Sequence, residues 1–287
     1  DSQLKEDNVM NAVLSQKQLD QVNQLGYVSL ISVLSEDEAN GYRAQLEAAE
    51  AACGGALKGH QRNKSHLLFK WLDDLIRDPR ILDPVEQIIG PNILCWNTIF
   101  WIKPAQSPSF VSWHQDTRYW GLSSDQVLTA WVALSPASVE SGCMRVLPNT
   151  HRGDVMPHAD RYHEDNMLTR GQEISEGIDE SSAVFMPLKT GEMSIHNYRL
   201  AHASGPNDSD DRRIGVSIHY MPTDTKQIVG EWDSAALVRG VDEYNHFLPA
   251  VRPTCDFDEP AVEFHTRATA LLNEVLYSGA AQNTAKL

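Results

Sequence analysis

The sequence predicts a mainly β protein, an antiparallel sandwich or barrel with helices before and after it. From residue 92 to residue 222, short β-branched and aromatic runs alternate with Gly, Pro, Asn and Asp, which is typical of such folds. Helix-start signals cluster before residue 90, and one helical pattern follows residue 260. The 287 residues, 41% of them hydrophobic, suffice for one large core. We therefore expect a single domain over residues 1–287.

The first 90 residues are expected to be mainly helical. Ser15 with Gln18, and Ser35 with Glu38, fit the capping-box pattern that opens a helix. Apolar residues spaced by threes and fours continue the second helix until Gly54-Gly55 ends it. Residues 27–34 read as a strand between these two helices.

A third helical region is expected over residues 72–89. Pro79 and Pro84 should break it into short pieces, and Gly90-Pro91 should end it.

Residues 91–222 form the predicted β core, with a C-terminal extension over 223–287. The polar stretch 151–180 lacks strand alternation and is interpreted as an insertion or lid. A last helix is expected over 262–276. Candidate strands are 93–102, 110–113, 127–134, 142–147, 183–186, 193–196 and 214–220.

Charge and hydropathy narrow the range of partners. The formal net charge of -15 would repel phosphate backbones and anionic lipid, so we expect neither nucleic acid nor a membrane as partner. No apolar run approaches the roughly 18 residues of a membrane span, and the polar first residues do not resemble a signal peptide. The four scattered cysteines form no C-x-x-C pair. A cytoplasmic protein with free thiols is expected.

The run Phe110-Val-Ser-Trp-His114-Gln-Asp116 is the best clue to function. A His and a carboxylate two residues apart on extended backbone point the same way, so both can ligate one metal ion. The same spacing occurs at His158/Asp160 and at His163/Asp165. Neither of those pairs leaves a strand-like segment, so we interpret both as part of a solvated, acidic lid.

A third ligand must come from elsewhere in the sheet, and His151, His196, His202 and His219 compete for this role. His202 is favoured because it stands where a strand-like segment runs out, and Arg213 follows eleven residues later. A guanidinium on the returning strand can face a carboxylate cosubstrate. His196 remains a rival ligand or a core imidazole, and Arg212 competes with Arg213, since only one of two adjacent side chains can face the site.

Several motifs in this order resemble Fe(II)/2-oxoglutarate dioxygenases, and more narrowly the phytanoyl-CoA dioxygenase family. The resemblance covers roughly residues 30–222 and implies a double-stranded β-helix, a cupin-like jelly roll with buttressing helices. The motifs are Gly90-Pro-Asn-Ile, Ile102-Lys-Pro104, Trp113-His-Gln-Asp116, Ala130-Trp131, Ser141-Gly-Cys-Met-Arg-Val-Leu-Pro-Asn-Thr-His151, Pro187 to Gly191-Glu192, and Arg212-Arg-Ile.

The resemblance also implies a chemistry. Fe(II) would be held by His114, Asp116 and His202, and a substrate C–H bond would be hydroxylated with O2 while 2-oxoglutarate becomes succinate and CO2. Arg213 would clamp the far carboxylate of 2-oxoglutarate, and Trp131 and Lys103 would be further contacts of that pocket. Halogenating members of the superfamily have Ala or Gly in place of the carboxylate, so Asp116 favours hydroxylation.

The substrate is predicted to be a small polar or anionic metabolite. Residues 59–66 are locally basic, so Arg62, Lys64 and His66 are candidate contacts of an anionic group, although a solvated loop explains them equally well. Asn97 is a candidate for the pocket wall. The chain resembles the bacterial small-metabolite branch of the family, which makes 2-aminoethylphosphonate the best specific candidate.

Other functions are compatible with the sequence. An ectoine-like compound, an amino acid or a natural product is the alternative substrate for hydroxylation. From other classes, the alternatives are a zinc-type hydrolase that uses the His-rich 151–180 segment and a non-catalytic jelly-roll binding module.

Overall fold

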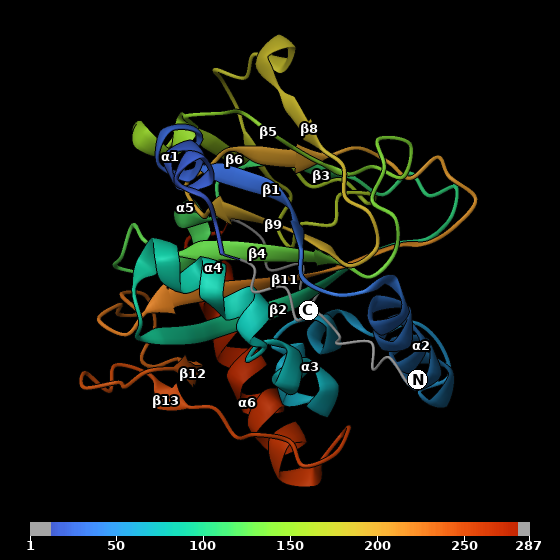
Figure 1. The fold of residues 1–287 in the computed structure, drawn as a ribbon, viewed down its shortest axis with the longest axis vertical. Helices are drawn as coiled ribbons and strands as arrows, with labels where there is room; N and C mark the ends of the chain where they lie inside the picture. Colours follow the sequence, from blue (N-terminus) through green and yellow to red (C-terminus); the bar gives the residue numbers. More distant parts are fainter. Residues whose placement is uncertain (1–12, 281–287) are drawn as a thin grey trace, which may run out of the picture.

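The protein folds as two β-sheets that face each other, with helices packed outside the larger sheet (Figure 1). The structure is a computed structural model and describes residues 13–280. The larger sheet runs in the order β1 (Tyr27–Ser32), β9 (Glu192–Asn197), β4 (Leu128–Ala133), β11 (Arg213–Pro222), β2 (Ile93–Lys103), β12 (Ser234–Arg239) and β13 (Leu248–Pro249).

The smaller sheet has the order β3 (Val111–His114), β10 (His202–Ser204), β5 (Met144–Val146) and β8 (Val184–Met186). From β2 to β5, and again from β8 to β11, successive core strands alternate between the two sheets, and the pairs that these strands form are antiparallel. This winding is that of a jelly roll, so the expected double-stranded β-helix is confirmed.

Helices cover the outer face of the larger sheet. They are α1 (Gln16–Leu25), α2 (Glu36–Ala52), α3 (Lys70–Leu75) and α4 (Pro79–Ile89). Two further helices, α5 (Thr117–Trp120) and α6 (Glu259–Leu276), pack against each other in a second apolar cluster. Short 3-10 turns span Gly59–Arg62, Ser65–Leu67, Thr150–Arg152 and Glu180–Ser182. Apolar residues of α1 to α4 and of β1, β2, β4, β9 and β11 form one continuous core. Burial of this surface is the main force that holds the layers together.

The N-terminal expectations are confirmed in most respects. Both capping boxes are formed, since Ser15 and Ser35 accept hydrogen bonds from the third residue of α1 and α2. Pro79 begins α4, where its missing N–H costs nothing. The expectation that Pro84 breaks the helix is wrong. Pro84 lies inside α4, whose apolar face is buried on the sheet, and that burial offsets the lost backbone bond.

Three other features differ from the predicted layout. The 151–180 segment contains a two-stranded ribbon, β6 (His158–Asp160) with β7 (Gln172–Ile174). His202 begins β10 rather than ending a strand, and β12 and β13 extend the larger sheet beyond the predicted core. All these strands have six residues or fewer, which is too short for a clear periodicity signal.

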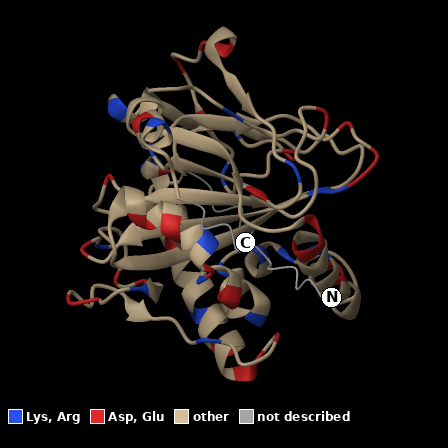
Figure 2. Ribbon diagram, viewed as in Figure 1, with Lys and Arg blue, Asp and Glu red and all other residues tan. Residues whose placement is uncertain are grey.

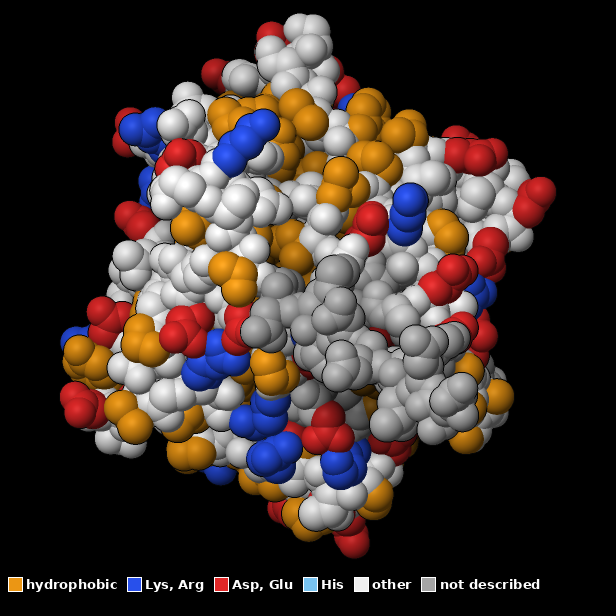
Figure 3. Space-filling model, in the orientation of Figure 1, with side chains coloured by type: hydrophobic (Ala, Val, Ile, Leu, Met, Phe, Trp, Pro, Cys, Tyr) orange, Lys and Arg blue, Asp and Glu red, His pale blue; other side chains and the backbone are white. Residues whose placement is uncertain are grey.

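The outer surface is acidic but mixed. Acidic side chains are spread over helices and loops, with basic side chains among them (Figure 2). On the face drawn in Figure 3, apolar side chains gather in the upper half, and charges of both signs lie below. Within residues 13–280, no helix is long and apolar enough to cross a membrane.

Candidate metal centre and adjoining cavity

A cavity of about 510 Å³ is lined by the inner faces of the two sheets and by neighbouring loops. This volume lies in the range of small-molecule sites. Strands β2, β4, β9 and β11 of the larger sheet and β3, β5 and β10 of the smaller sheet contribute to it, together with the 164–169 part of the insertion. The fold therefore brings the sequence-predicted ligands and the arginine to one enclosed space.

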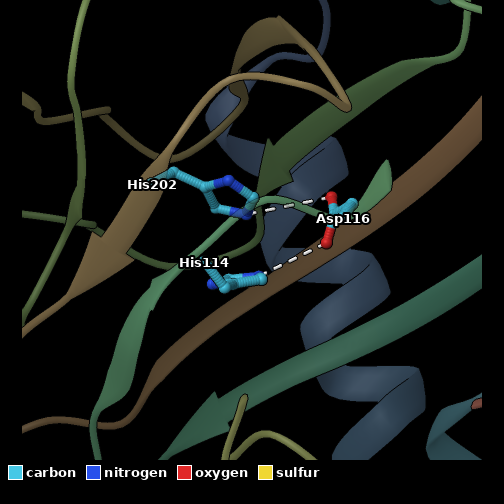
Figure 4. Close-up of side chains that lie close together, drawn as sticks. All are labelled: His114, Asp116 and His202. Atoms are coloured by element: carbon cyan, nitrogen blue, oxygen red, sulfur yellow. Dashed lines mark ion pairs between the residues drawn. The ribbon is translucent and has the colours of Figure 1, made fainter. Parts of the chain in front are cut away.

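His114, Asp116 and His202 converge inside this cavity (Figure 4). His114 ends β3, Asp116 directly precedes α5, and His202 begins β10, which pairs with β3 so that His202 lies opposite His114. The Asp116 carboxylate lies 3.3 Å from His114 Nε2 and 3.9 Å from His202 Nε2. One atom from each residue falls within a 4.8 Å span, a geometry that can hold a metal ion.

Backbone hydrogen bonds fix the tautomers of both imidazoles. His114 Nδ1 lies 2.9 Å from the carbonyl of Ser112, and His202 Nδ1 lies 2.9 Å from the carbonyl of Leu200. Since a carbonyl can only accept, each Nδ1 carries the proton and each Nε2 keeps its lone pair. Both lone pairs are therefore available on the side that faces Asp116.

Burial keeps the histidines neutral. It lowers the pKa of His114 and of His202 to about 4, so both rings are ready to ligate without losing a proton. Burial also raises the pKa of the Asp116 carboxyl to about 6. A divalent cation at this point would stabilise the carboxylate form. Two neutral imidazoles and one carboxylate on one side are the donor set of non-haem Fe(II) sites with open positions.

Gln115, between the two ligands, is held by the insertion. Its backbone N–H donates to His158 Nε2 at 3.0 Å, and its side-chain oxygen accepts from Met156 N–H at 2.8 Å. The side-chain amide donates to the carbonyl of Arg199 at 2.6 Å. The interpretation of His158 as part of a solvated lid is wrong, because its ring lies on β6 and packs against Tyr119. His163 does lie on the surface, with 57% of its side chain exposed.

Arg213 provides a buried positive charge near the triad. It begins β11, is 3% exposed, and donates to the carbonyl of Gly142 at 2.7 Å. Among residues 13–280, no carboxylate pairs with it, and its Nε has no hydrogen-bond partner. Burial lowers the pKa of this guanidinium to about 10, which leaves it charged at neutral pH. An unpaired buried guanidinium fits the carboxylate of a ligand such as 2-oxoglutarate.

Trp131 and Gly215 shape the space beneath the guanidinium. The Arg213 guanidinium carbon lies 5.4 Å from the centre of the Trp131 ring, which lines the cavity. A Cβ on Gly215 would lie 1.9 Å from that ring, so only glycine allows Trp131 to lie across β11. This requirement of Gly215 has no sequence signal beyond a lone glycine in a strand.

Lys103 lies behind the cavity wall rather than in it. It is the cross-strand partner of Arg213, and its ammonium donates to Ser204 Oγ at 2.8 Å and to the carbonyl of Gly205. Ser204 lines the cavity, whereas Lys103 does not. The Lys103 side chain therefore holds Ser204, and its position does not support the expected direct contact of Lys103 with 2-oxoglutarate. Burial and the charge of Arg213 lower the pKa of Lys103 to about 6.

Three of the four expected substrate contacts do not face the cavity. The Lys64 ammonium is buried against Asp233 at 3.2 Å and donates to the carbonyls of Trp96 and Ser234. Asn97 accepts from Lys64 N–H at 2.7 Å, and the His66 ring bonds Thr98 Oγ1 at 3.1 Å. These residues connect the Ser65–Leu67 turn to β2, so the structure contradicts their expected role in substrate binding.

Arg62 alone of that group lines the cavity. Burial lowers the pKa of its guanidinium, and no carboxylate of the described residues is paired with it. Arg212 also lines the cavity, but its charge is paired with Glu47 at 3.2 Å and Glu50 at 2.8 Å on α2. This pairing distinguishes Arg212 from Arg213, as strand alternation had indicated.

Sequence reasoning missed Thr129 and Trp120, and it considered His196 and His219 only as rival metal ligands rather than as walls of the cavity. His196, Thr129 and His219 line it from β9, β4 and β11, and Trp120 of α5 stacks on the His219 ring at 4.3 Å. His196 lies with its ring 4.7 Å from that of His202 but outside the triad. Inward-facing alternation on these strands was the available signal, and it becomes useful only when the strand order is known.

A jelly roll whose cavity holds a two-histidine, one-carboxylate triad, beside a buried arginine with no carboxylate partner among residues 13–280, is the architecture of Fe(II)/2-oxoglutarate-dependent oxygenases. The phytanoyl-CoA dioxygenase (PhyH) family model matches residues 22–215. The chain belongs to this family, whose oxygenases use Fe(II), 2-oxoglutarate and O2.

Curated relatives match parts of the chain. A probable alpha-ketoglutarate-dependent hypophosphite dioxygenase of Stutzerimonas stutzeri is 30% identical over 58% of this chain and 58% of its own length. The peroxisomal phytanoyl-CoA dioxygenase of Rattus norvegicus is 26% identical over 87% of this chain and 81% of its own length. The chain thus spans little more than half of the first relative.

Solved structures match more fully. The apo form of a non-haem monooxygenase, ThoJ, is 35% identical, with a TM-score of 0.81 over 91% of this chain and 98% of that one. CytC3 with Fe(II) and alpha-ketoglutarate has a TM-score of 0.62 at 24% identity, over 86% of this chain and 97% of its own. The second likeness supports the fold alone.

Proposed function

We propose that this protein is an Fe(II)/2-oxoglutarate-dependent dioxygenase that hydroxylates an aliphatic C–H bond of a small polar metabolite and releases succinate and CO2. The observation that carries the proposal is the convergence of His114, Asp116 and His202 beside an unpaired, buried Arg213. His114, Asp116 and His202 would hold the iron, which supplies O2 activation when bound. Family membership supports this assignment.

The residues of the chain position and shield the reaction. Arg213 would hold the far carboxylate of 2-oxoglutarate above the Trp131 ring, since its donors not bonded to Gly142 are unpaired. Ser204, held by Lys103, adds a hydroxyl at the cavity wall. Asp116 occupies the third protein position, which leaves no place there for a halide and favours hydroxylation over halogenation.

An organophosphonate such as 2-aminoethylphosphonate is the first candidate substrate. Arg62 supports it, since an unpaired guanidinium on the cavity wall suits a phosphonate. The hypophosphite dioxygenase relative also acts on a phosphorus compound, according to its name.

Larger polar substrates are the second candidate, and the cavity favours them by its size. Its volume of about 510 Å³ can take an ectoine-like compound, an amino acid or a natural product as well as 2-oxoglutarate. Apolar residues of β2 and of the insertion supply contacts for a carbon skeleton.

One experiment tests both the class and the substrate. Fe(II) and then 2-oxoglutarate are added anaerobically, and we expect a weak visible charge-transfer band. With O2 admitted, succinate is measured across a panel of phosphonates, betaines and amino acids. Asp116→Ala should abolish hydroxylation, and Arg213→Ala should mainly weaken 2-oxoglutarate binding. Iron-loaded protein without the band contradicts the proposal, and turnover that needs no oxygen would favour a hydrolase.

A further inference from the structure

A row of polar side chains crosses the floor of the cavity beside the metal centre. In the register of the larger sheet, Thr129 of β4 lies opposite His196 of β9 on one side and His219 of β11 on the other. Directly paired residues project from the same face of a sheet, and all three line the cavity. We call these three residues the polar row.

The polar row is buried without internal partners. Thr129 is 3% exposed, His196 1% and His219 2%. Among the described residues, nothing bonds Thr129 Oγ1, either ring nitrogen of His196, or His219 Nδ1. Buried polar atoms in native proteins are nearly always hydrogen-bonded, so four unpartnered atoms on three residues that line one cavity point to a ligand.

Neighbouring side chains hold His219 in place. Its Nε2 bonds Ser217 Oγ at 3.0 Å, and the same oxygen accepts from Trp101 Nε1–H at 3.0 Å. Trp120 stacks on the ring at 4.3 Å with an angle of 28°. The ring is thus fixed with Nδ1 left for another molecule, which is the preorganisation expected of a binding site.

We propose that the polar row is a subsite for an uncharged hydrogen-bonding group of the substrate, a hydroxyl or a carboxamide, bound next to the metal. This inference rests on the proposed oxygenase function, and it favours the larger polar substrates over 2-aminoethylphosphonate, which has no hydroxyl or carboxamide. The neutral imidazole of His196 offers one donor and one acceptor, His219 offers its Nδ1, and the Thr129 hydroxyl can both donate and accept, which matches such groups. None of the three residues of the polar row is formally charged. The charged side chains that line the cavity are Arg213, six residues before His219 on β11, and, on other segments, Arg62, Arg212, Glu50, Glu164, Asp165 and the ligand Asp116.

The location assigns a role to the subsite. The His196 ring lies 4.7 Å from that of His202, so a group held there is adjacent to the reacting centre. A substrate with an anionic end at Arg62 and an uncharged end on the polar row would span the cavity. The polar row would then determine which carbon is presented for hydroxylation.

The test uses four five-carbon probes that differ only in the polar group: pentanamide, pentan-1-ol, pentanoate and pentylammonium. Each is titrated calorimetrically into the anaerobic protein loaded with Fe(II) and 2-oxoglutarate. We expect pentanamide or pentanol to bind at least tenfold more tightly than either ion. Thr129→Val, which keeps the side-chain shape, and His219→Phe, which keeps the stack on Trp120, should each lose that preference.

Ser194→Ala is the matched control. Ser194 lies two residues before His196 on β9, is buried with an unpartnered hydroxyl, and does not line the cavity. This variant should bind the probes as the wild type does.

Other outcomes overturn the inference. If Thr129→Val or His219→Phe weakens the 2-oxoglutarate band, the polar row belongs to the cosubstrate. If His196→Phe prevents iron loading, that residue serves the metal. The subsite is refuted if pentanamide and pentanol do not bind. It is also refuted if neither of them binds more tightly than pentanoate and pentylammonium. Failure of the oxygenase proposal itself is distinguishable, because the wild type would then form no band.

Discussion

Gly215 shapes the cavity because its lack of a side chain leaves room for the Trp131 ring. We expect Gly215→Ala to displace the Trp131 ring, because the new Cβ would lie 1.9 Å from it. Overpacking of this kind costs about 1–3 kcal/mol of stability. The loss of the ring beneath Arg213 should weaken 2-oxoglutarate binding about tenfold. Anaerobic titration of the charge-transfer band measures this, and Gly41→Ala, with open space around its Cβ, is the control. Unchanged affinity would contradict the expectation.

Lys103 is expected to make stability depend on pH. The pKa of its side chain is about 6 in the folded protein, below the ordinary lysine value of 10.5 that applies in the unfolded chain. Between these values the unfolded state binds more protons, so the free energy of unfolding should rise with pH across this window. The slope contributed by one such group is at most about 1.4 kcal/mol per pH unit.

Urea unfolding of the metal-free protein at pH 6.5, 7.5 and 8.5 measures this slope. Lys103→Met removes the titrating group and should flatten the dependence relative to the wild type. Equal slopes in the two proteins would show that Lys103 keeps an ordinary pKa in the folded state.

At the scale of elements, the 151–180 insertion does more than cover the cavity. Through His158 it accepts the N–H of Gln115, which lies between two proposed iron ligands. His158→Phe keeps the contact with Tyr119 but removes this acceptor. We expect Fe(II) affinity to fall about tenfold, as for other residues that orient metal ligands. Anaerobic calorimetry with Fe(II) measures it.

The comparison variant is His163→Phe, on the exposed surface of the same insertion. It should bind Fe(II) as the wild type does. Equal weakening in both variants would assign the effect to general disturbance of the insertion rather than to the bond with Gln115.

Elements differed in how far the sequence could predict them. Capping boxes at Ser15 and Ser35 and long strands such as β2 and β11 carry local signals, and their positions were predicted closely. The triad and Arg213 were found through motif order, and the fold brings them into one cavity.

Long-range placement was not predictable in the same way. Lys64 reads as a surface cation, yet its charge is satisfied by Asp233, which lies far along the chain. The polar row exists only through the pairing of β9, β4 and β11. Such contacts depend on strand order, which single-sequence patterns do not contain.

At the scale of the whole molecule, the same cavity residue that should bind 2-oxoglutarate lowers the folding stability of the ligand-free protein. Arg213 is buried without a carboxylate, which costs folding free energy until an anion arrives. In the wild type, 2-oxoglutarate added to metal-loaded protein at 100 times its Kd should stabilise the fold by about 2.7 kcal/mol. Thermal unfolding with and without the ligand measures this gain.

Variants of the adjacent Arg212 and Arg213 test this relation between folding stability and cosubstrate binding. Arg213→Met should unfold at or above the wild-type temperature without ligands, because the unpaired charge is gone, and 2-oxoglutarate should no longer raise that temperature. Arg212→Met removes a paired charge and leaves Glu50 buried alone, so it should unfold at a lower temperature yet keep the full gain from 2-oxoglutarate. If both variants lose stability equally and both keep the gain, Arg213 does not bind the cosubstrate. The opposite effects expected at neighbouring positions arise from charge pairing, because the Arg212 guanidinium is bonded to carboxylates of α2, whereas Arg213 pairs with no carboxylate among residues 13–280.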